Sequence, residues 1–599
     1  MESEPVPKKL SLFRLVLDQA RVDDDVLSHH YEGSGTADDP FVVTWIPNDA
    51  GNPFNWSKKY RWIINYIAAL SCFCAAFASS AFSGTFIELL YHFRTNQELI
   101  TAGISLFVLG FAVGPLLWAP LSEIFGRQIV YVTTFAGFTV FNAACTGANS
   151  IGTLLVFRFF AGAFGSSPFT NAGGVIADIF PASERGMAMG IFSLAPCMGP
   201  TLGPFIAGFL GENEGWRWVM GLMAIFSGIL WIAGAIFVPE TYAPVLLRRR
   251  AAALSKRTGK VYKTKVEIET GPIHPLAILK TNLVRPWILL FMEPIVLLLS
   301  IYIAIIYGTL YMFFAAYPIV FQQHRGWTEG IGGLPFLGVA IGMFVAIIVS
   351  GITAKIYDRH AAEAGGFAQP ESRLIGAMIG AIPIPAGIFW FAWTNSPSIH
   401  WMACVAAGVP FGFGFVLVFL SVTSYLIDAY TIFAASVLAA NAVIRSLFGA
   451  AFPLFTRQMY ANLGLHWASC VPAFLALICV PFPFILYKYG AAIRRRCIYA
   501  AKAEEAMNEL REKAIAGAAP KSVSTTPSDG ASFNGNEHEE DRSTQEKEPE
   551  LLRSRSRANT IPDPAAIYDG NPFTIDRVNT NTSTAGLELT RTTTRKSMK

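Results

Sequence analysis

Three charged residues lie inside long apolar stretches of this sequence, where a charge can take part in proton chemistry. Glu293 directly precedes Pro294, Arg158 lies well inside its stretch, and Arg445 lies near the middle of another. A charge in lipid is costly and normally faces the interior of a helix bundle, so each one marks a candidate functional site. Because burial favours the neutral form of a carboxyl group, Glu293 suits alternate binding of a proton and another ligand. For each residue, a buried structural role is the alternative.

A second group of charges is predicted at the cytosolic ends of helices. Arg127 closes the loop 121–127 and can reach Glu123, Asp178 or the last carbonyl groups of a neighbouring helix. Such a cluster has to break when two packed halves rock against each other. The alternative is a charge that only orients the chain in the membrane. Asp428 is interpreted as an interfacial residue.

Glycine and proline recur at fixed spacing in the stretch from Gly190 to Gly208. Gly199, Gly203 and Pro204 lie between these two residues. Glycines at this spacing remove side chains from one helix face and allow close approach of a neighbour. Proline adds kinks, because it lacks a backbone donor. Generic small-residue packing is the alternative interpretation.

Polar and aromatic side chains also recur within the apolar stretches. Asn171 and Asn441 are uncharged, and Tyr307 and Tyr311 stand one helical turn apart. Aromatic-lined cavities with few polar anchors suit varied hydrophobic ligands, so these four residues are predicted to line a substrate cavity. Ordinary packing of aromatic residues is the alternative.

Motifs of enzymes and cofactor proteins are absent from the sequence. There is no nucleotide-binding P-loop, and the nine histidines lack the spacing of a zinc site. Of the eight cysteines, all but Cys497 lie in apolar stretches, which indicates small buried side chains. We therefore expect no enzyme activity, no cofactor, no metal and no disulfide scaffold.

The composition of the chain indicates that its apolar stretches are surrounded by lipid rather than by water. The chain has 599 residues, 53% of them hydrophobic and 15% charged, whereas soluble domains average about 25% charged. Its net charge of +4 is too small to indicate nucleic-acid binding. A bilayer core needs about 20 apolar residues per helix. Twelve stretches meet this test, beginning near Trp62, Thr101, Ile129, Ile151, Gly186, Trp218, Arg285, Ile331, Leu374, Ile399, Ile432 and Trp467.

These stretches predict an all-α membrane protein of twelve transmembrane helices in two six-helix halves with disordered cytosolic tails. Nine Lys and Arg residues lie in the central loop, whereas the outer hairpins carry only Arg94, Arg217, Arg325 and Arg457. The positive-inside rule therefore places both termini in the cytosol. The predicted divisions are an N-terminal tail (1–60), a first half (61–239), a central loop (240–284), a second half (285–490) and a mostly disordered C-terminal tail (491–599).

Several of these motifs together resemble the major facilitator superfamily. The glycines of the fifth helix resemble its antiporter motif, with Ala207 in place of one glycine. The stretch 114–127, including Gly126, resembles its signature loop. Glu123 replaces an Asp there, Ala119 a Gly and Gln128 a basic residue.

Two further resemblances narrow the family. The stretch from Arg158 to Asp178 is similar to a motif of the twelve-spanner drug:proton antiporters. The phrases 239–242 and 441–449 point to the filamentous-fungal branch of that family. The resemblance covers about residues 50–490.

The resemblance implies a proton-coupled exporter that works by alternating access. Glu293 is expected to bind and release the transported proton, and Arg158 and Arg445 are expected to set its pKa. The residues expected to serve conformational switching are Glu123, Gly126, Arg127 and Asp178. The expected partners are a small amphipathic substrate (a drug, toxin or secondary metabolite), protons and the bilayer, for a monomer in the plasma membrane. A polyamine exporter, an uptake symporter and a non-transporting sensor that signals through its C-terminal tail are the alternatives. Only Glu293 is a clearly embedded acid, which favours neutral or weakly charged compounds over polyamines.

Overall fold

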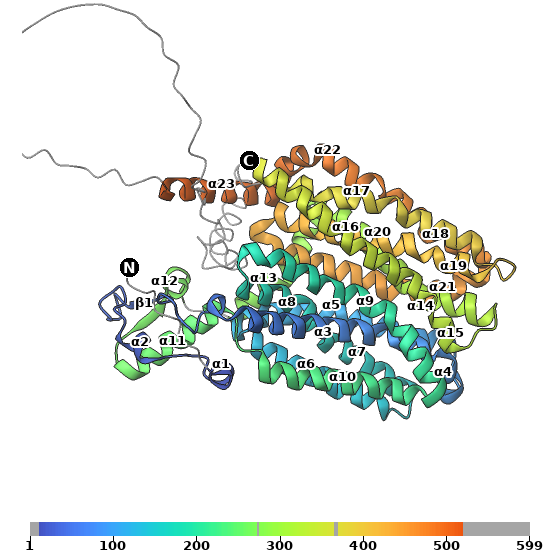
Figure 1. Ribbon diagram of the computed structural model, residues 1–599, viewed down its shortest axis with the longest axis horizontal. Coiled ribbons are helices and arrows are strands. Elements are labelled where there is room, and N and C mark those ends of the chain that lie inside the picture. Colours follow the sequence, from blue (N-terminus) through green and yellow to red (C-terminus); the bar gives the residue numbers. More distant parts are fainter. Residues whose placement is uncertain (1–10, 272–274, 364–368, 519–599) are drawn as a thin grey trace, which may run out of the picture.

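The computed structural model describes residues 11–271, 275–363 and 369–518, and it is almost entirely helical. Two helical halves lie side by side along one long axis, and a small domain covers one end (Figure 1). The first half consists of α3 (Lys58–Ala81), η2 (Phe82–Thr85), α4 (Phe86–Phe93), α5 (Gln97–Phe125), α6 (Arg127–Thr146), α7 (Ile151–Gly165), α8 (Ser167–Ile179), α9 (Ala182–Glu214) and α10 (Trp216–Phe237).

The second half is more interrupted, because proline starts several of its segments. Its long elements are α13 (Pro275–Met292), α14 (Pro294–Tyr317), α16 (Phe336–Glu363), α18 (Pro383–Thr394), α20 (Gly408–Ala429), α21 (Ala434–Cys479) and α22 (Pro481–Arg496). Its short elements are η3 (Pro318–Gln323), α15 (Glu329–Gly333), η4 (Pro370–Leu374), α17 (Ile375–Ala381), α19 (Trp401–Ala406) and η5 (Thr431–Phe433). A further helix, α23 (Ile498–Ala518), follows the bundle.

Local signals in the sequence define the helix starts. The side chain of Asn96 accepts the N–H of Leu99 at 3.0 Å, and Ser150 accepts that of Thr153 at 3.2 Å. Each contact satisfies an N–H group that has no partner within its helix. Gly126, with φ of 105°, makes the sharp turn between α5 and α6.

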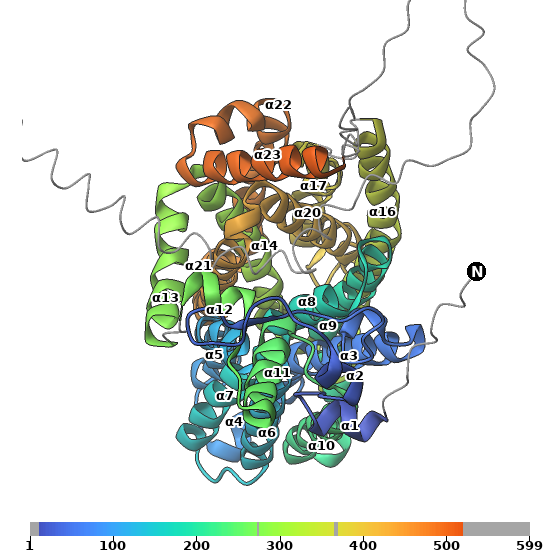
Figure 2. The same cartoon turned by 90° about the vertical axis from the view of Figure 1, so that its left-hand side faces the viewer.

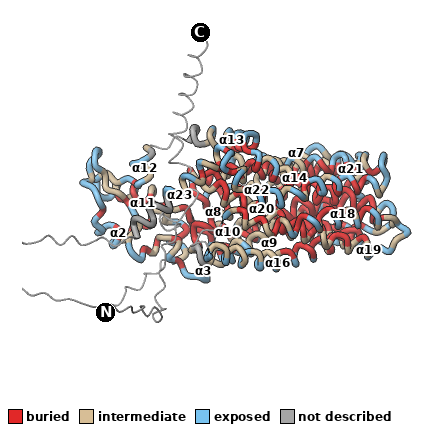
Figure 3. Tube along the Cα trace, turned by 90° about the horizontal axis from the view of Figure 1, so that it is seen from above, coloured by how far each residue is buried: buried red, intermediate tan, exposed pale blue. Residues whose placement is uncertain are grey.

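The outer surface of the bundle is apolar, as a lipid-facing surface requires. On α10, Ile225, Ile229, Ile232 and Ile236 recur at helical spacing, and each is at least half exposed. Buried residues fill the middle of the bundle, where the helices meet (Figure 3). The arrangement supports a multi-pass membrane protein, because water would not stabilise such a surface.

Ten helices among the described residues are long and apolar enough to cross a membrane, against twelve predicted. A break at Ser166 divides the fourth predicted span into α7 and α8, of 15 and 13 residues, so neither counts alone. The last two predicted spans form one stretch of 66 residues, Thr431–Arg496. Within it, Gly464 has the non-helical angles φ 72° and ψ 176°.

The N-terminal tail differs from the predicted disorder over residues 11–57. It forms α1 (Leu12–Leu17), α2 (Asp24–Ser28), β1 (Phe41–Val43) and η1 (Pro53–Asn55). The central loop forms α11 (Ala243–Thr258), β2 (Tyr262–Thr264) and α12 (Lys265–Thr270). Residues of α2 and β1 pack on α11 and β2, whereas α1 contacts α10 and η1 contacts α8. Strands β1 and β2 pair in parallel, with Phe41 opposite Tyr262. The tail orders because its apolar residues, such as Val26 and Val43, find partners in Leu247 and Leu254.

Buried polar contacts stabilise this small domain. Arg250 forms an ion pair with Asp49, and both side chains are almost fully buried. Arg21 donates to the backbone oxygens of Leu15 (3.2 Å) and Glu240 (3.0 Å). Burial lowers the pKa of Arg21 to about 10, so its guanidinium stays charged at neutral pH.

The small domain and α23 lie at the same end of the bundle. Viewed from that end, the small domain covers the first half, and α23 crosses the second (Figure 2). Residues 519–599, most of the predicted disordered C-terminal tail, lie outside the described residues.

Candidate functional site

A charge cluster joins α5, α6 and α8 at the end of the bundle near the small domain. Arg127 begins α6, and its Nε lies 3.7 Å from Oδ2 of Asp178. Its Nη1 donates to Oγ of Ser122 at 2.6 Å, and its guanidinium lies 4.9 Å from the ring centre of Tyr242. Arg127 and Asp178 are each 5% exposed. The structure thus brings together two of the residues predicted for switching, and the charge of the half-buried Glu123 also acts on Arg127.

Glu240 completes this cluster, and the sequence analysis missed its role. Its carboxylate accepts the backbone N–H groups of Arg127 (3.0 Å) and Gln128 (3.3 Å), which otherwise have no partner at the start of α6. A Cβ on Gly126 would lie 2.0 Å from Oε2 of Glu240, so that position requires glycine. In the sequence, Glu240 lies in the stretch 239–242, which indicated the family resemblance but gave no role for this carboxylate. Glu240 also connects the cluster to the small domain, because its backbone oxygen accepts from Arg21.

The second half holds a similar cluster at the same end of the bundle. Nε of Arg373 lies 2.8 Å from Oδ2 of Asp428, and the hydroxyl of Tyr357 donates to the same oxygen at 3.0 Å. Arg373 stands before the ninth predicted span as Arg127 stands before the third. In the sequence, the stretch 353–359 ends in Arg359 with the same spacing that ends 121–127 in Arg127, and a loop is expected there. The structure instead continues α16 through this stretch, and Arg359 is exposed. Asp428, interpreted from the sequence only as a residue at the membrane interface, therefore also forms an ion pair with Arg373.

A third cluster ties the last span to the ninth. Nε of Arg494 donates to Oε1 of Glu371 at 2.8 Å and its Nη2 to Oε2 at 3.2 Å. Nη1 of Arg494 reaches Glu504 of α23 at 3.1 Å. A two-pronged, buried pair of this kind fixes orientation as well as distance.

Arg158 is fully buried and bound by backbone oxygens. Its Nε, Nη1 and Nη2 donate to the carbonyls of Gly103 (3.2 Å), Ala78 (2.9 Å) and Ser79 (3.2 Å). Its guanidinium also lies over the rings of Phe82 and Phe107. These contacts join α7 to α3 and α5, which matches the structural alternative for this residue.

Glu293 lies at the break between α13 and α14 and is fully buried. Its Oε2 accepts from the hydroxyl of Tyr430 at 2.9 Å, and its Oε1 accepts the backbone N–H of Tyr499 in α23 at 2.7 Å. Burial and the neighbouring carboxylate raise the pKa of the Cys497 thiol to about 12. Glu293 therefore lies next to the connection from α22 to α23, and its contacts include neither Arg158 nor Arg445. The structure does not join the three residues predicted for proton coupling.

Polar and aromatic residues meet between the two halves. The hydroxyl of Tyr311 lies 2.8 Å from Oγ of Ser79 on α3, and the hydroxyl of Tyr307 donates to that of Tyr311 at 3.4 Å. The guanidinium of Arg445 lies 5.2 Å from the ring centre of Tyr307. Asn441 donates to Ser300 at 3.4 Å in the same half. Asn171, also predicted for the cavity, bonds instead to Ser167 of its own helix.

The glycine-rich helix α9 packs closely on both halves. A Cβ on Gly203 would lie 2.9 Å from the backbone nitrogen of Ala81, and one on Gly199 2.8 Å from the oxygen of Phe73. A Cβ on Gly208 would lie 2.6 Å from the oxygen of Glu329 in the second half. The oxygen of Pro204 likewise limits the space at Gly333 of α15. Gly190 differs, because nothing lies within 4 Å of its missing side chain.

At the far end of the bundle, two carboxylates cross between the halves in opposite directions. Oε1 of Glu329 on α15 accepts the N–H of Ile87 on α4 at 2.6 Å. Oε2 of Glu212 on α9 accepts the N–H of Gly330 at 3.0 Å. Hydropathy gave no signal for this pair, which depends on how the halves dock.

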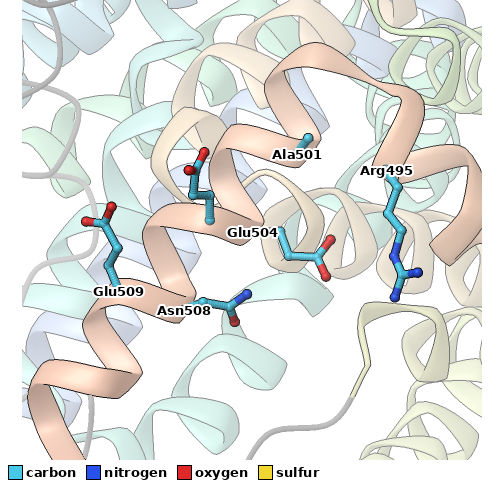
Figure 4. A pocket seen from close by; sticks show the side chains of 6 residues that line it. Arg495, Ala501, Glu504, Asn508 and Glu509 are labelled. Carbon is cyan, nitrogen blue, oxygen red and sulfur yellow. The ribbon is translucent and has the colours of Figure 1, made fainter.

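An open pocket lies between α22 and α23 and shares Glu504 with the third cluster. Arg495 of α22 and Glu504, Glu505 and Glu509 of α23 are among the residues that line it, and Arg495 and Glu504 face each other (Figure 4). This pocket is outside the bundle, whereas the residues predicted to line the substrate cavity lie inside the bundle. Within the described ranges, no group of His, Cys, Asp or Glu could hold a metal ion.

Comparisons with known proteins agree with this architecture. Residues 68–453 match the Major Facilitator Superfamily family model. The chain is 54% identical over 584 residues to the MFS-type efflux pump MFS2 of Trichophyton rubrum, covering 97% of each chain. It is also 54% identical over 589 residues to the major facilitator superfamily multidrug transporter mdrA of Aspergillus fumigatus, again covering 97% of each. The efflux pump FUB11 of Gibberella moniliformis is 51% identical over 511 residues, covering 85% of this chain and 86% of that one.

Among solved structures, the proton:xylose symporter XylE has a similar fold. The TM-score is 0.53 at 15% identity, with 72% of this chain and 96% of that one covered. This likeness concerns the fold alone, whereas the relatives extend over nearly the whole sequence. The chain therefore belongs to the major facilitator superfamily, and it is a multi-pass membrane protein similar to efflux pumps of filamentous fungi.

Proposed function

We propose that this protein is a secondary active transporter that exports small amphipathic compounds in exchange for protons. The observation that carries the proposal is the arrangement of contacts at the two ends of the bundle. Glu329 and Glu212 join the two halves at one end, whereas the clusters around Arg127 and Arg373 each lie within one half at the other. Alternating access requires the contacts between halves at one end to break while contacts at the other end form.

The proposed topology has twelve crossings with both termini in the cytosol of the plasma membrane. The stretch Thr431–Arg496 is about 100 Å long as a helix, more than three times the thickness of a bilayer core. It is proposed to cross twice and turn at Gly464. Helices α7 and α8 together are proposed to form one crossing, since Arg158 within them is buried by α3 and α5.

Protons are proposed to enter from outside and to bind Glu293, the fully buried carboxyl group at the break in the seventh span. Tyr430 provides a hydroxyl next to the carboxylate. The membrane potential adds about 2.3 kcal/mol per charge per 100 mV to the driving force. We assign Arg158 to holding α7 against its neighbours rather than to tuning Glu293.

The alternatives make different demands on the site. A polyamine carries several positive charges and would be repelled by Arg445, which contacts no acid in the part of the chain that the structure describes. A sensor would signal through the C-terminal tail and would lose its output when the chain is truncated after Arg496. An exporter should retain flux after the same truncation.

The test is flux in proteoliposomes with an imposed pH gradient. Radiolabelled fluconazole, spermidine and an aromatic carboxylate such as 2-naphthoate serve as probes of three chemical classes. We expect uphill movement of at least one amphipathic probe, and its loss when a protonophore collapses the gradient. Flux that is insensitive to the gradient for every transported probe, or no flux of any probe, contradicts the proposal.

A further inference from the structure

The two embedded arginines use their hydrogen-bond donors differently. All three side-chain nitrogens of Arg158 donate hydrogen bonds to backbone carbonyl oxygens. Arg445 is half-buried and lies over the ring faces of Tyr307 and Phe419, at 5.2 and 5.3 Å. It forms no hydrogen bond or ion pair with any residue that the structure describes, and its buried Nε has no partner there. A cation with unused donors is therefore present where the two halves meet.

No carboxylate lies near the middle of the elements around Arg445. Helix α21, which carries it, contains no Asp or Glu, and neither do α3 and α14. On α5, α9 and α20 the acids lie only in the terminal turns. The fully buried Glu293, at the start of α14, is already bound to Tyr430 and Tyr499. Burial of the partnerless Nε of this half-buried arginine is costly, so the site favours an anion supplied from outside the chain.

Aromatic rings surround this cation and suit an apolar ligand body. The ring centres of Tyr307 and Tyr311 lie 4.9 Å apart, and those of Tyr307 and Phe415 lie 6.5 Å apart. Phe415 and Phe419 are nearly parallel, with centres 6.2 Å apart. The hydroxyl of Tyr311 contacts Ser79 of the first half. A ligand held here would thus touch residues whose positions depend on both halves.

We propose that Arg445 binds the negatively charged group of the exported compound, so that the preferred substrates are organic anions, chiefly carboxylates, with an aromatic or apolar body. The guanidinium offers its unused N–H groups to the carboxylate in a two-pronged geometry. The rings of Tyr307 and Phe419 contact the body. This inference rests on the proposed function and specifies its substrate class, and it replaces the expectation that Arg445 tunes Glu293.

The experiment measures equilibrium binding to the full chain in lipid nanodiscs without any gradient. The probes are 2-naphthoate and 2-naphthamide, which have nearly the same shape and differ in charge. We expect the wild type to bind the carboxylate at least ten-fold more tightly than the amide. Arg445→Gln should abolish this preference, and Arg445→Lys should retain part of it because the charge remains. Arg457→Gln is the matched control, since Arg457 is an exposed arginine on the same helix.

Three results would overturn the proposal. These are equal affinity of the wild type for both probes, no saturable binding of 2-naphthoate to the wild type, and an unchanged preference in Arg445→Gln. Thermal unfolding of each variant checks its folding, and the comparison of probes on the wild type stands even if Arg445→Gln does not fold. Failure of the proposed function is distinguishable, because it would leave the carboxylate preference intact while removing proton-driven flux.

Discussion

The carboxylate of Glu293 accepts the backbone N–H of Tyr499 at 2.7 Å, which ties the break in the seventh span to the first turn of α23. The same carboxylate accepts the hydroxyl of Tyr430. Two roles are therefore compatible with this buried acid. It can bind a transported proton, or it can only anchor the helix that follows the bundle.

Two variants separate these roles. Glu293→Gln keeps the shape of the side chain but cannot release a proton, so we expect pH-driven efflux to stop while exchange of substrate for substrate survives. Truncation after Arg496 removes Tyr499 and α23 but leaves the carboxyl group, so pH-driven efflux should persist. Flux in proteoliposomes with and without a gradient measures both. If the two variants behave alike, Glu293 serves only as an anchor.

Arg127→Ala should abolish transport and also lower stability. Removal of the cation takes the Arg127 charge away from the buried carboxylate of Asp178, which still accepts from the Thr241 hydroxyl, at a cost of about 3–5 kcal/mol. The double variant Arg127→Ala with Asp178→Asn should recover most of the thermal stability but not the flux. Arg359→Ala, at an exposed arginine near the end of α16, is the control and should resemble the wild type. Normal flux in the double variant would show that the charge pair has no role in switching.

Gly203→Ala should lower stability by roughly 1–3 kcal/mol, as overpacking does. The new methyl group would meet the backbone of α3, with Ala81 N at 2.9 Å and Phe77 O at 3.0 Å, and backbone cannot move aside cheaply. Gly190→Ala on the same helix is the matched control, because nothing lies within 4 Å of that position. Thermal unfolding and surface delivery measure the difference. Equal behaviour of the two variants would refute close packing of α9 on α3 as the role of this motif.

Glu329→Ala should loosen the end of the bundle where the halves are joined. The variant removes the acceptor of the Ile87 N–H and should shift the population towards the outward-open state. Labelling of Ser79→Cys from outside by a membrane-impermeant maleimide should rise several-fold, because Ser79 is buried against Tyr311 in this structure. Glu214→Gln, at an exposed acid near the end of α9, is the control. Unchanged labelling in Glu329→Ala would show that this contact does not restrain opening.

The proposed topology predicts that a C-terminal epitope tag is protected from protease in intact cells. A second epitope inserted after Ser398, in a hairpin proposed to lie outside, should be cleaved in the same cells. Permeabilisation should expose both. Cleavage of the C-terminal tag in intact cells would place that terminus outside and contradict the model of both termini in the cytosol.

Several features could be predicted from the sequence because they act along a single helix. Hydropathy located the apolar spans, and the spacing of Gly199, Gly203 and Gly208 predicted a bare helix face. The position of Arg127 at a helix end predicts that it reaches Glu123, Asp178 or the last carbonyl groups of a neighbouring helix, and the structure pairs it with Asp178. The family itself followed from local motifs of this kind.

The tertiary structure alone decided which polar groups meet. Glu240 caps the start of α6 from 113 positions away, and Glu329 crosses to Ile87 from a distance of 242 positions. No periodicity encodes such contacts, because they depend on how separate helices dock. The same reason explains the two embedded arginines, which look alike in the sequence. Carbonyl oxygens of neighbouring helices satisfy Arg158, whereas the packing of α21 leaves Arg445 with aromatic faces and unused donors.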